Sequence, residues 1–458
     1  MRIFYGWWVV AAAFLNLFFG VGIVFYGMPV FYPELVRNLG FSRSQVTAGV
    51  LLGFLIVAPF VGYLGSLIDR RGARAIIRFG LIFVGGPLIL MGWMTHLWQY
   101  YLLSIAEVFG YILTGPIPNQ VLIARWFRAA RGRAMGYAYL GLGVGGAVSP
   151  ILVHFLIAHY GWRRAFEVVG LLILIVLLPI AQWVTRSAPE DMGLAPDGVE
   201  VPAAQPSAPA VVFNLRRVAR SANFWLILLG STLVIGAIGT VIQQFVLFLH
   251  DQKYTLGQAS VISSGLLFAG LAGRVIVGYL ADRFQKKNVM ATFYLVLALA
   301  IPLLFVARYP VAAWSFAIIF GFAMGADYML IPLVTAECFG LATLGKLLAV
   351  IIMANSLGQW IGPWTAGLIF DATHSYNIAW AAITIGGIVG AYLIYSININ
   401  REQTAGAPRH STMTATPARV SKLPATMAQV KRSPSSTTLA STPHTGTCSV
   451  CAMVRLTG

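Results

Sequence analysis

The chain has 458 residues, of which 58% are hydrophobic and only 10% are charged, whereas about a quarter of the residues in an ordinary soluble domain carry a charge. This composition excludes a water-soluble fold, because soluble chains of this length need charged exteriors around their cores. The formal net charge of +17 would indicate a nucleic-acid ligand in a soluble protein, but basic loops at a membrane surface explain it better in an apolar chain. We therefore expect a membrane protein without a nucleic-acid partner.

Apolar segments recur along the chain, and each is long enough to span a bilayer, which takes about 20 residues. We count twelve, with centres near residues 20, 55, 85, 110, 145, 172, 235, 268, 298, 324, 357 and 387. The first runs from Gly6 to Phe31 and is too long for a cleaved signal peptide. The ninth and tenth are separated only by the short stretch 307–310. The sequence therefore predicts an all-α membrane protein with twelve transmembrane helices.

The distribution of basic residues predicts how these helices are oriented. If the N-terminus lies in the cytoplasm, most of the 31 Lys and Arg residues fall in inner loops and tails. Lys and Arg are retained on the cytoplasmic side of a membrane. We therefore expect a multi-pass protein of the cell (inner) membrane, monomeric in the lipid bilayer, with both termini in the cytoplasm.

The apolar rhythm breaks after the sixth segment, where several prolines stand among small and polar residues. Proline at this density cannot continue a helix. We therefore predict a cytoplasmic linker over 186–221, between an N-terminal six-helix half over 1–185 and a C-terminal six-helix half over 222–399. Residues 400–458 are rich in Ser, Thr, Pro and Ala, and Glu402 is their only acid. Such a segment cannot bury enough apolar area to offset its ordering entropy, so we predict a disordered basic cytoplasmic tail.

The two halves repeat each other. Asp69 in the first half has a counterpart in Asp282 of the second half. Gly145 and Gly358 are separated by the same number of residues as that aspartate pair. One shared offset at two separate places indicates two parallel six-helix repeats, an arrangement that puts a substrate site near the bilayer midplane between the halves.

The turn after the second segment reads Gly65-Ser66-Leu67-Ile68-Asp69-Arg70-Arg71-Gly72-Ala73-Arg74, and a shorter copy begins at Gly278. This pattern resembles the inter-helix signature of the major facilitator superfamily. A short turn that holds a carboxylate and several cations can bridge neighbouring helices, and such contacts can break and re-form as the halves rock. The alternative is that these charges only retain the inner loops in the cytoplasm. We expect the gating group to contain Asp69, Arg70, Arg74, Arg131, Asp282 and Arg283.

A narrower resemblance begins at Trp126 and ends at Gly145. The stretch is similar to the signature of the monocarboxylate transporter family, and its matching positions are Phe127, Arg131, Ala134, Gly136, Ala138, Gly141 and Gly145. The resemblance covers about residues 1–399 and is closest to bacterial members and to oxalate/formate exchanger relatives. It departs from the family before Gly6, where an acidic residue is missing. The resemblance implies a secondary active transporter of a small organic monocarboxylate that works by alternating access.

Arg274 in the eighth segment is the predicted binding group for the substrate carboxylate. It precedes the helix-ending Asp282 by eight residues, which places it about 12 Å into the membrane. A charge at the centre of a membrane helix costs at least ~2.5–3.5 kcal/mol, so it should face a cavity or a partner. A guanidinium group binds a carboxylate through two parallel hydrogen bonds, and the arginine that matches it in the family binds substrate carboxylate. The alternative is a structural arginine paired with another helix.

Proton coupling needs a carboxyl group inside the membrane. The family often has an aspartate four residues before the arginine, but this chain has Gly270 there. Asp327 in the tenth segment is our first candidate to replace it, and Glu107 in the fourth segment is its rival. The alternative for each is a packing residue that stays protonated.

Other polar residues at cavity depth are candidates for substrate contact. Tyr26 falls about where some family members carry a lysine, and Asn355 falls near a cation of the oxalate exchanger relatives. The loss of both cations leaves one central positive charge, which suits a monoanion better than a dianion. For each residue the alternative is a contact that holds two helices together. The predicted substrate-binding set is Arg274, Tyr26, Asn119, Gln243, Gln244, Tyr328 and Asn355.

The sequence predicts no enzyme, cofactor or metal site, since it has no phosphate-binding glycine loop, metal-ligand cluster or nucleophile elbow. Two alternatives stay open. One is efflux or exchange of another organic anion or a drug, although a drug cavity would gain little from the fixed charge of Arg274. The other is a non-transporting membrane sensor, which would need a folded output domain in the cytoplasm. The expected partners are a small organic anion, a proton as co-substrate and the lipid bilayer.

Overall fold

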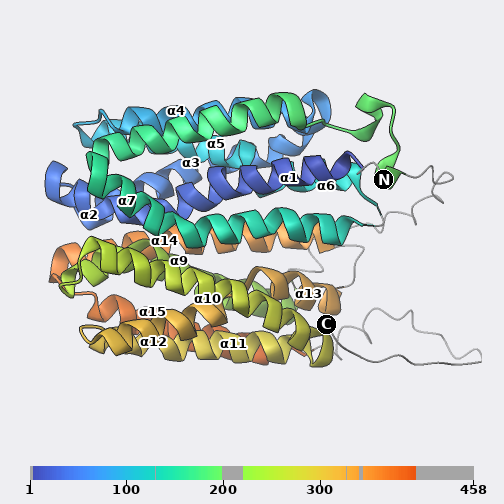
Figure 1. The fold of residues 1–458 in the computed structure, drawn as a ribbon. Coiled ribbons are helices and arrows are strands. Elements are labelled where there is room, and N and C mark those ends of the chain that lie inside the picture. The colour runs from blue at the N-terminus through green and yellow to red at the C-terminus, as the bar shows by residue number, and fades with distance from the viewer. Residues whose placement is uncertain (1–3, 129, 199–219, 326, 340–343, 399–458) are drawn as a thin grey trace, which may run out of the picture. The chain divides into compact units, whose positions relative to one another are not determined.

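The computed structural model describes residues 4–128, 130–198, 220–325, 327–339 and 344–398. At some helical positions, among them Asp69, Asp282, Asp327 and Tyr328, it describes the backbone only. The described residues form helices and the turns between them (Figure 1). The all-α prediction is therefore confirmed.

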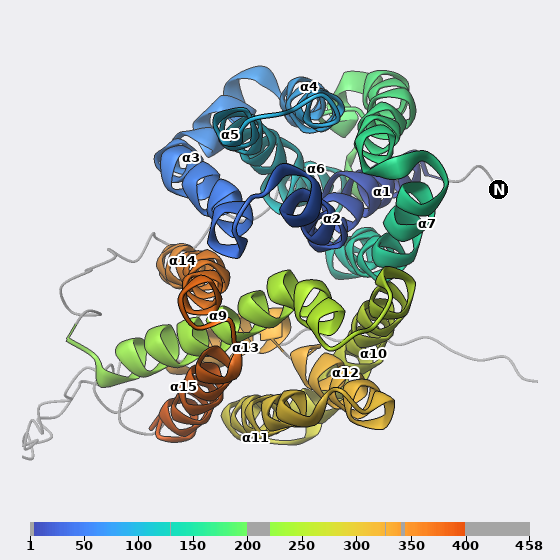
Figure 2. The same cartoon turned by 90° about the vertical axis from the view of Figure 1, so that its left-hand side faces the viewer.

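Two bundles of helices lie beside each other (Figures 1 and 2). The first bundle contains α1 (Gly6–Asn16), the π-helical η1 (Leu17–Ile23), α2 (Val24–Leu39), α3 (Arg43–Arg71), α4 (Ala73–Met91), α5 (Leu97–Thr114), α6 (Pro116–Trp126), α7 (Arg131–Pro179) and the π-helical η2 (Ile180–Val184). The second contains α9 (Ala222–Asp251), α10 (Leu256–Arg283), α11 (Lys286–Ala300), η5 (Ile301–Val306), α12 (Pro310–Met324), α13 (Asp327–Phe339), α14 (Leu344–Thr373) and α15 (Asn377–Tyr395). Short 3₁₀ turns follow the first bundle at η3 (Pro189–Met192) and η4 (Pro196–Gly198).

Eleven helical stretches among the described residues are long and apolar enough to cross a membrane. The stretch Arg131–Val184 has 54 residues and contains two crossings, because the chain reverses at Gly161, where φ is 79° and ψ is 158°. A positive φ of this kind costs glycine little, whereas other residues avoid it. The ninth and tenth crossings separate between Val306 and Pro310, as the sequence predicts. The count of twelve is therefore confirmed.

The two bundles repeat the same local structures. A capping box formed by Ser42 and Gln45 begins α3, and an equivalent box formed by Thr255 and Gln258 begins α10. Each box satisfies backbone N–H groups that the first turn of a helix leaves without partners. The close helix contact made by Gly145 also recurs in the second bundle at Gly358. A Cβ added to these glycines would lie 2.4 Å from the Phe18 carbonyl oxygen and 2.7 Å from the Thr232 carbonyl oxygen.

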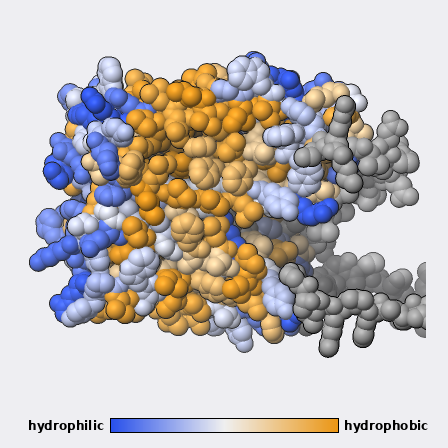
Figure 3. Space-filling model, in the orientation of Figure 1, coloured by the Kyte–Doolittle hydropathy of each residue, from blue (hydrophilic) through white to orange (hydrophobic). Residues whose placement is uncertain are grey.

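A belt of apolar side chains covers the middle of the molecule, and hydrophilic residues gather at the left-hand end in Figure 3. Large apolar residues such as Ile56, Ile175, Val275 and Val311 are exposed in the structure. In a membrane protein such residues face lipid rather than water. The turns α2–α3, α9–α10 and α14–α15 lie at the left-hand end in Figure 1. We call this the outer end, following the orientation that the basic residues predict.

Candidate functional site

A cavity of about 80 Å³ lies between the two bundles. Residues of α2, α3 and α5 line it from the first bundle, and residues of α9 and α14 line it from the second. The lining is largely aromatic and apolar, with a few polar groups. Its members are Phe25, Met28, Tyr32, Val50, Phe54, Glu107, Val108, Tyr111, Ile112, Gln243, Ser356, Gln359 and Trp360.

Glu107 on α5 brings a carboxyl group to this cavity. The residue is only 5% exposed, and among the described residues it has no hydrogen bond or ion pair. An ionised carboxylate without a partner is costly to bury, so such a group is held in its neutral, protonated form until a cation or water reaches it. Glu107 therefore has the chemistry to take up a proton when buried and to release it where water reaches it.

Gln243 on α9 lies at the same cavity and is 2% exposed. Its Oε1 accepts a hydrogen bond of 2.9 Å from the hydroxyl of Tyr32 on α2. This bond joins the two bundles, so Gln243 has both a structural contact and a surface toward the cavity.

Arg274 on α10 is half-buried and reaches the facing surface of α7 in the first bundle. Its Nη1 lies 3.0 Å from the position that a Cβ on Gly143 would occupy, so the missing side chain of Gly143 makes room for the guanidinium group. Among the described residues Arg274 has no hydrogen bond or ion pair. It does not line the cavity of Glu107, but it carries a positive charge on the surface between the bundles.

The tenth crossing packs on α10 beside Arg274. The helix α12 ends at Met324 and α13 begins at Asp327. A Cβ on Gly325 would lie 2.6 Å from the Arg274 amide nitrogen and 2.5 Å from the Gly270 carbonyl oxygen, so Gly325 packs directly on α10. A Cβ on Gly270 would itself lie 3.2 Å from the Gly321 carbonyl oxygen. A side chain at position 270 would therefore be tight against the backbone of α12.

The side chains of Asp327 and Tyr328 lie outside the described residues. Tyr26 is described, and its ring covers Gly146 on α7, since a Cβ there would be 2.7 Å from the tyrosine Cδ2. Tyr26 does not line the 80 Å³ cavity, although its neighbour Phe25 does.

Asn119 on α6 is fully buried inside the first bundle. Its Nδ2 donates hydrogen bonds of 2.7 Å and 2.8 Å to the carbonyl oxygens of Thr114 and Gly115. Its Oδ1 accepts a hydrogen bond of 3.3 Å from Asn16. These contacts stabilise the turn between α5 and α6. Asn119 does not line the 80 Å³ cavity.

Asn355 and Gln244 also make contacts within the second bundle. The Oδ1 of Asn355 accepts hydrogen bonds of 2.9 Å from Ser231 and Thr232, and Asn355 lines a separate cavity of about 40 Å³. The Nε2 of Gln244 donates a hydrogen bond of 2.8 Å to the Pro363 carbonyl oxygen. Gln244 therefore faces away from the cavity that its neighbour Gln243 lines.

The described cations of the predicted gating group make contacts inside their own bundles. Arg74 donates to the Gln182 carbonyl oxygen, and Arg131 donates to the carbonyl oxygens of Phe127 and Ala124 at 3.2 Å and 3.1 Å. The remaining two cations, Arg70 and Arg283, are exposed, and the latter has its Cζ 4.1 Å from the centre of the Tyr279 ring. The carboxyl groups of Asp69 and Asp282 lie outside the described side chains, so their gating role stays a prediction.

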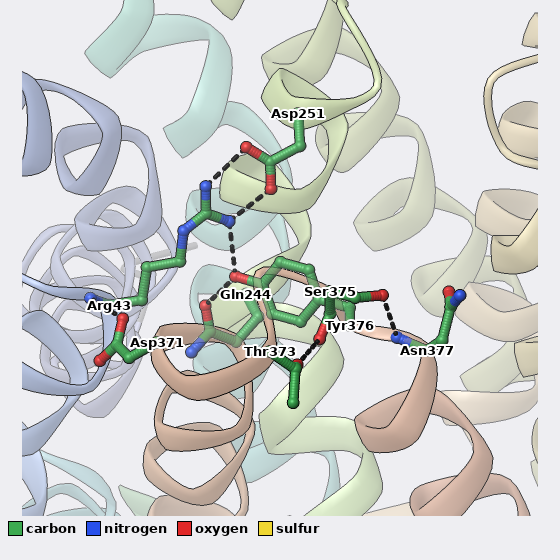
Figure 4. A network of polar contacts seen from close by, with 8 residues as sticks. All are labelled: Arg43, Gln244, Asp251, Asp371, Thr373, Ser375, Tyr376 and Asn377. Carbon is green, nitrogen blue, oxygen red and sulfur yellow. Dashed lines mark hydrogen bonds and ion pairs between the residues drawn. The ribbon is translucent and has the colours of Figure 1, made fainter.

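A charged network at the outer end was not predicted from the sequence (Figure 4). Arg43, the first residue of α3, donates through both terminal nitrogens to the carboxylate of Asp251 at 2.5 Å each. Its Cζ lies 3.6 Å from the centre of the Phe370 ring. The Asp371 carboxylate accepts from the backbone nitrogens of Arg43 and Ser44 at 3.1 Å and 3.0 Å. Side chains of the second bundle therefore hold both the side chain and the backbone of one end of α3.

Tyr376 connects this network to Gln244. Its hydroxyl accepts a hydrogen bond of 2.9 Å from Arg43 Nη1 and donates one of 2.8 Å to Gln244 Oε1. Burial raises the pKa of the Tyr376 hydroxyl, so the group stays protonated and can keep this donor role. The only sequence signal for the network is that opposite charges stand in three predicted outer turns.

Comparisons with known proteins agree with this fold. The family model of the Major Facilitator Superfamily matches residues 13–268 and 245–444. The chain is 25% identical over 382 residues to the membrane sensor protein UhpC of Escherichia coli (strain K12), with coverage of 79% of this chain and 85% of the relative. It is 25% identical over 428 residues to monocarboxylate transporter 12 of Mus musculus, with 86% of each chain covered.

A solved structure of the nucleoside transporter NupG (D323A mutant) has the same fold, with a TM-score of 0.69, 14% sequence identity, and coverage of 86% of this chain and 99% of that one. The family model matches both bundles, and the solved structure covers most of the same residues. The chain belongs to the major facilitator superfamily.

Proposed function

We propose that this protein is a secondary active transporter that moves a small organic monocarboxylate together with a proton by alternating access. The observation that carries the proposal is Arg274, a cation on the surface between the bundles with no anionic partner among the described side chains. A guanidinium group in that position costs free energy unless an anion reaches it. A carboxylate substrate supplies that anion and matches the planar geometry of the guanidinium group.

Glu107 supports the proton-coupled form of the proposal. It is a buried carboxyl at the cavity between the bundles, and a neutral carboxyl can carry a proton through the membrane without the cost of a buried charge. Asp327 is the second candidate, because it follows Gly325 by two residues, and Gly325 packs against the backbone of Arg274. In the proposed cycle, one of these two carboxyls binds the proton and Arg274 binds the substrate carboxylate.

The similarity to a membrane sensor protein favours a second candidate function, in which ligand binding is signalled and no solute is moved. The similarity to monocarboxylate transporter 12 extends over a larger share of this chain. The charge of Arg274, which has no anionic partner among the described side chains, suits a carboxylate in either case. We propose transport rather than catalysis, in the inner membrane with cytoplasmic termini.

Uptake into proteoliposomes tests the proposal. The purified full chain is reconstituted, and uptake of labelled acetate, lactate, pyruvate and benzoate is measured with and without an imposed pH gradient. We expect uptake of at least one acid, with faster accumulation when the lumen is alkaline. Binding of an acid without any uptake or exchange would favour the sensor, and the absence of both would refute the monocarboxylate proposal.

A further inference from the structure

Two levels of contact join the bundles on the outer side of the cavity. The deeper level is the hydrogen bond from Tyr32 to Gln243. The outer level is the ion pair between Arg43 and Asp251, together with the Asp371 carboxylate that binds the start of α3. Gln243 and Asp251 lie on the same helix, eight residues apart, which corresponds to about 12 Å along its axis.

The two levels are built from different chemistry. The outer level is ionic and two-pronged, and Phe370 and Tyr376 pack against its guanidinium group. The deeper level is a single hydrogen bond between neutral groups, and charge-assisted bonds are roughly twice as strong as neutral ones. The outer level therefore holds the bundles together more strongly than the deeper level.

The two levels also differ in what they can contact. Tyr32 and Gln243 line the cavity, whereas Arg43 and Asp251 do not. A polar group of a bound molecule can compete with Tyr32 for the amide of Gln243. It cannot reach the ion pair, so any effect of cavity occupancy on the outer level must be carried by the protein.

The helix α9 provides such a connection. Gln243 contacts the cavity, and the next residue, Gln244, accepts a hydrogen bond from Tyr376, which itself accepts one from Arg43. Gln244 is also fixed to α14 through the Pro363 carbonyl oxygen. A displacement of α9 at Gln243 is therefore transmitted to the neighbours of Arg43 within the same turn of helix.

We propose that the outer entrance is closed by these two levels, and that a bound substrate releases the deeper one, Tyr32–Gln243, while the ionic level keeps an empty cavity closed to the outside. The proposal rests on the proposed function in one respect, namely that the chain binds a small carboxylate, and it adds that this molecule also enters the cavity beside Gln243, which Arg274 does not line. It adds a residue pair that links occupancy of the cavity to the outer closure.

Distance measurements between spin labels test the closure. Cys338, Cys448 and Cys451 are replaced by serine, and labels are placed at Arg37→Cys on α2 and His250→Cys on α9, which are exposed near the outer end. We expect one short distance to predominate in the reconstituted full chain without ligand. Arg43→Gln and Asp251→Asn should each raise the ratio of long to short distances by about tenfold or more, because each leaves the other charge without its partner. Arg163→Gln is the control, since that guanidinium group bonds only to the Gly92 and Met94 carbonyl oxygens of the first bundle.

Tyr32→Phe tests the deeper level, because it removes the hydroxyl and keeps the ring. Alone and without ligand it should leave the short distance predominant, since the ionic level still holds. Combined with Arg43→Gln it should raise the long-distance ratio further than Arg43→Gln alone. Saturating acid, chosen from the four used for uptake, should raise the ratio in the parent chain only to the value of unliganded Tyr32→Phe, because both then lack the same bond, and should leave the ratio of Tyr32→Phe unchanged.

The outcomes separate the parts of the proposal. An unchanged distance in Arg43→Gln refutes the ionic level, and a double variant equal to Arg43→Gln refutes the deeper level; neither result needs a ligand. A Tyr32→Phe variant that responds to acid as the parent does, or a parent that does not respond at all, refutes the link to occupancy. Calorimetric titration with the same acids shows separately whether the chain binds a carboxylate, and uptake into proteoliposomes shows whether it transports one, so a failure of the proposed function is distinguished from a failure of the closure.

Discussion

Arg274 is the single residue on which the substrate assignment depends most directly. We expect Arg274→Lys to bind a transported acid at least tenfold more weakly, although the positive charge is kept. An ammonium group is a point donor and cannot form two parallel hydrogen bonds to one carboxylate, whereas a guanidinium group can. Calorimetric titration of purified protein measures the dissociation constant, and Arg163→Lys is the matched control at the outer end of the first bundle. Equal affinity in Arg274→Lys and the parent would show that the carboxylate is bound elsewhere.

Two carboxyl groups compete for the coupled proton. Glu107→Gln and Asp327→Asn each mimic the protonated form, so the variant that removes the coupling group should no longer accumulate substrate on a pH gradient. Exchange of substrate for substrate should persist in that variant, because exchange requires no net release of a proton. The cavity position and low exposure of Glu107 lead us to expect this loss for Glu107→Gln. Uphill uptake in both variants would mean that the proton travels with the substrate itself.

At the scale of helices, the packing of α10 on α12 is the contact that places Arg274. A Cβ on Gly273 would lie 2.0 Å from the Phe322 carbonyl oxygen, and a backbone atom cannot move away as a flexible side chain can. We therefore expect Gly273→Ala to destabilise the protein by about 1–3 kcal/mol, the usual cost of an overpacked core. Thermal unfolding in detergent measures this loss. Gly86→Ala on α4 is the control, because no atom lies within 4 Å of its added Cβ, and an equal loss in both variants would assign the effect to alanine itself.

For the molecule as a whole, the transport cycle requires the inner ends of the bundles to separate and close again. We expect Asp69→Asn and Asp282→Asn to lower the turnover rate several-fold and to leave substrate affinity nearly unchanged. Asp69 and Asp282 lie in the last turns of α3 and α10, and Asp282 is about 12 Å along α10 from Arg274. Their carboxylates can therefore affect rocking without touching a small substrate bound at Arg274. Uptake rates and binding titrations separate these effects, and a loss of affinity at constant turnover would place the two residues in the binding site.

The sequence predicted the twelve crossings because each is an apolar run between polar turns, and it predicted the repeat because paired residues share one offset. It could not predict the close packing of Gly325 on the backbone of α10, since that contact depends on how two helices approach each other. It also missed the pairing of Arg43 with Asp251, which are 208 residues apart. Such a contact depends on how the two bundles approach each other, and Arg43 taken alone reads as one more charge in an outer loop. For the same reason Gln243 and Gln244 looked equivalent, although one faces the cavity and the other faces Tyr376.

The π-helical stretch Leu17–Ile23 gives the first crossing a surplus residue. An ordinary α-helix advances about 100° per residue, since it has 3.6 residues per turn, whereas a π-helical turn accommodates additional chain within the same hydrogen-bonded ladder. The residues of α2, including Tyr26 and Tyr32, follow this stretch directly. Their angular position around the helix therefore depends on how the π-helical turn accommodates the surplus residue. Deletion of one residue between Leu17 and Ile23 should therefore restore α-geometry and keep the bond from Tyr32 to Gln243. Deletion of one residue from the α-helical part between Tyr26 and Tyr32 should instead rotate Tyr32 by about 100° and lose that bond, although no residue that makes the bond has been changed.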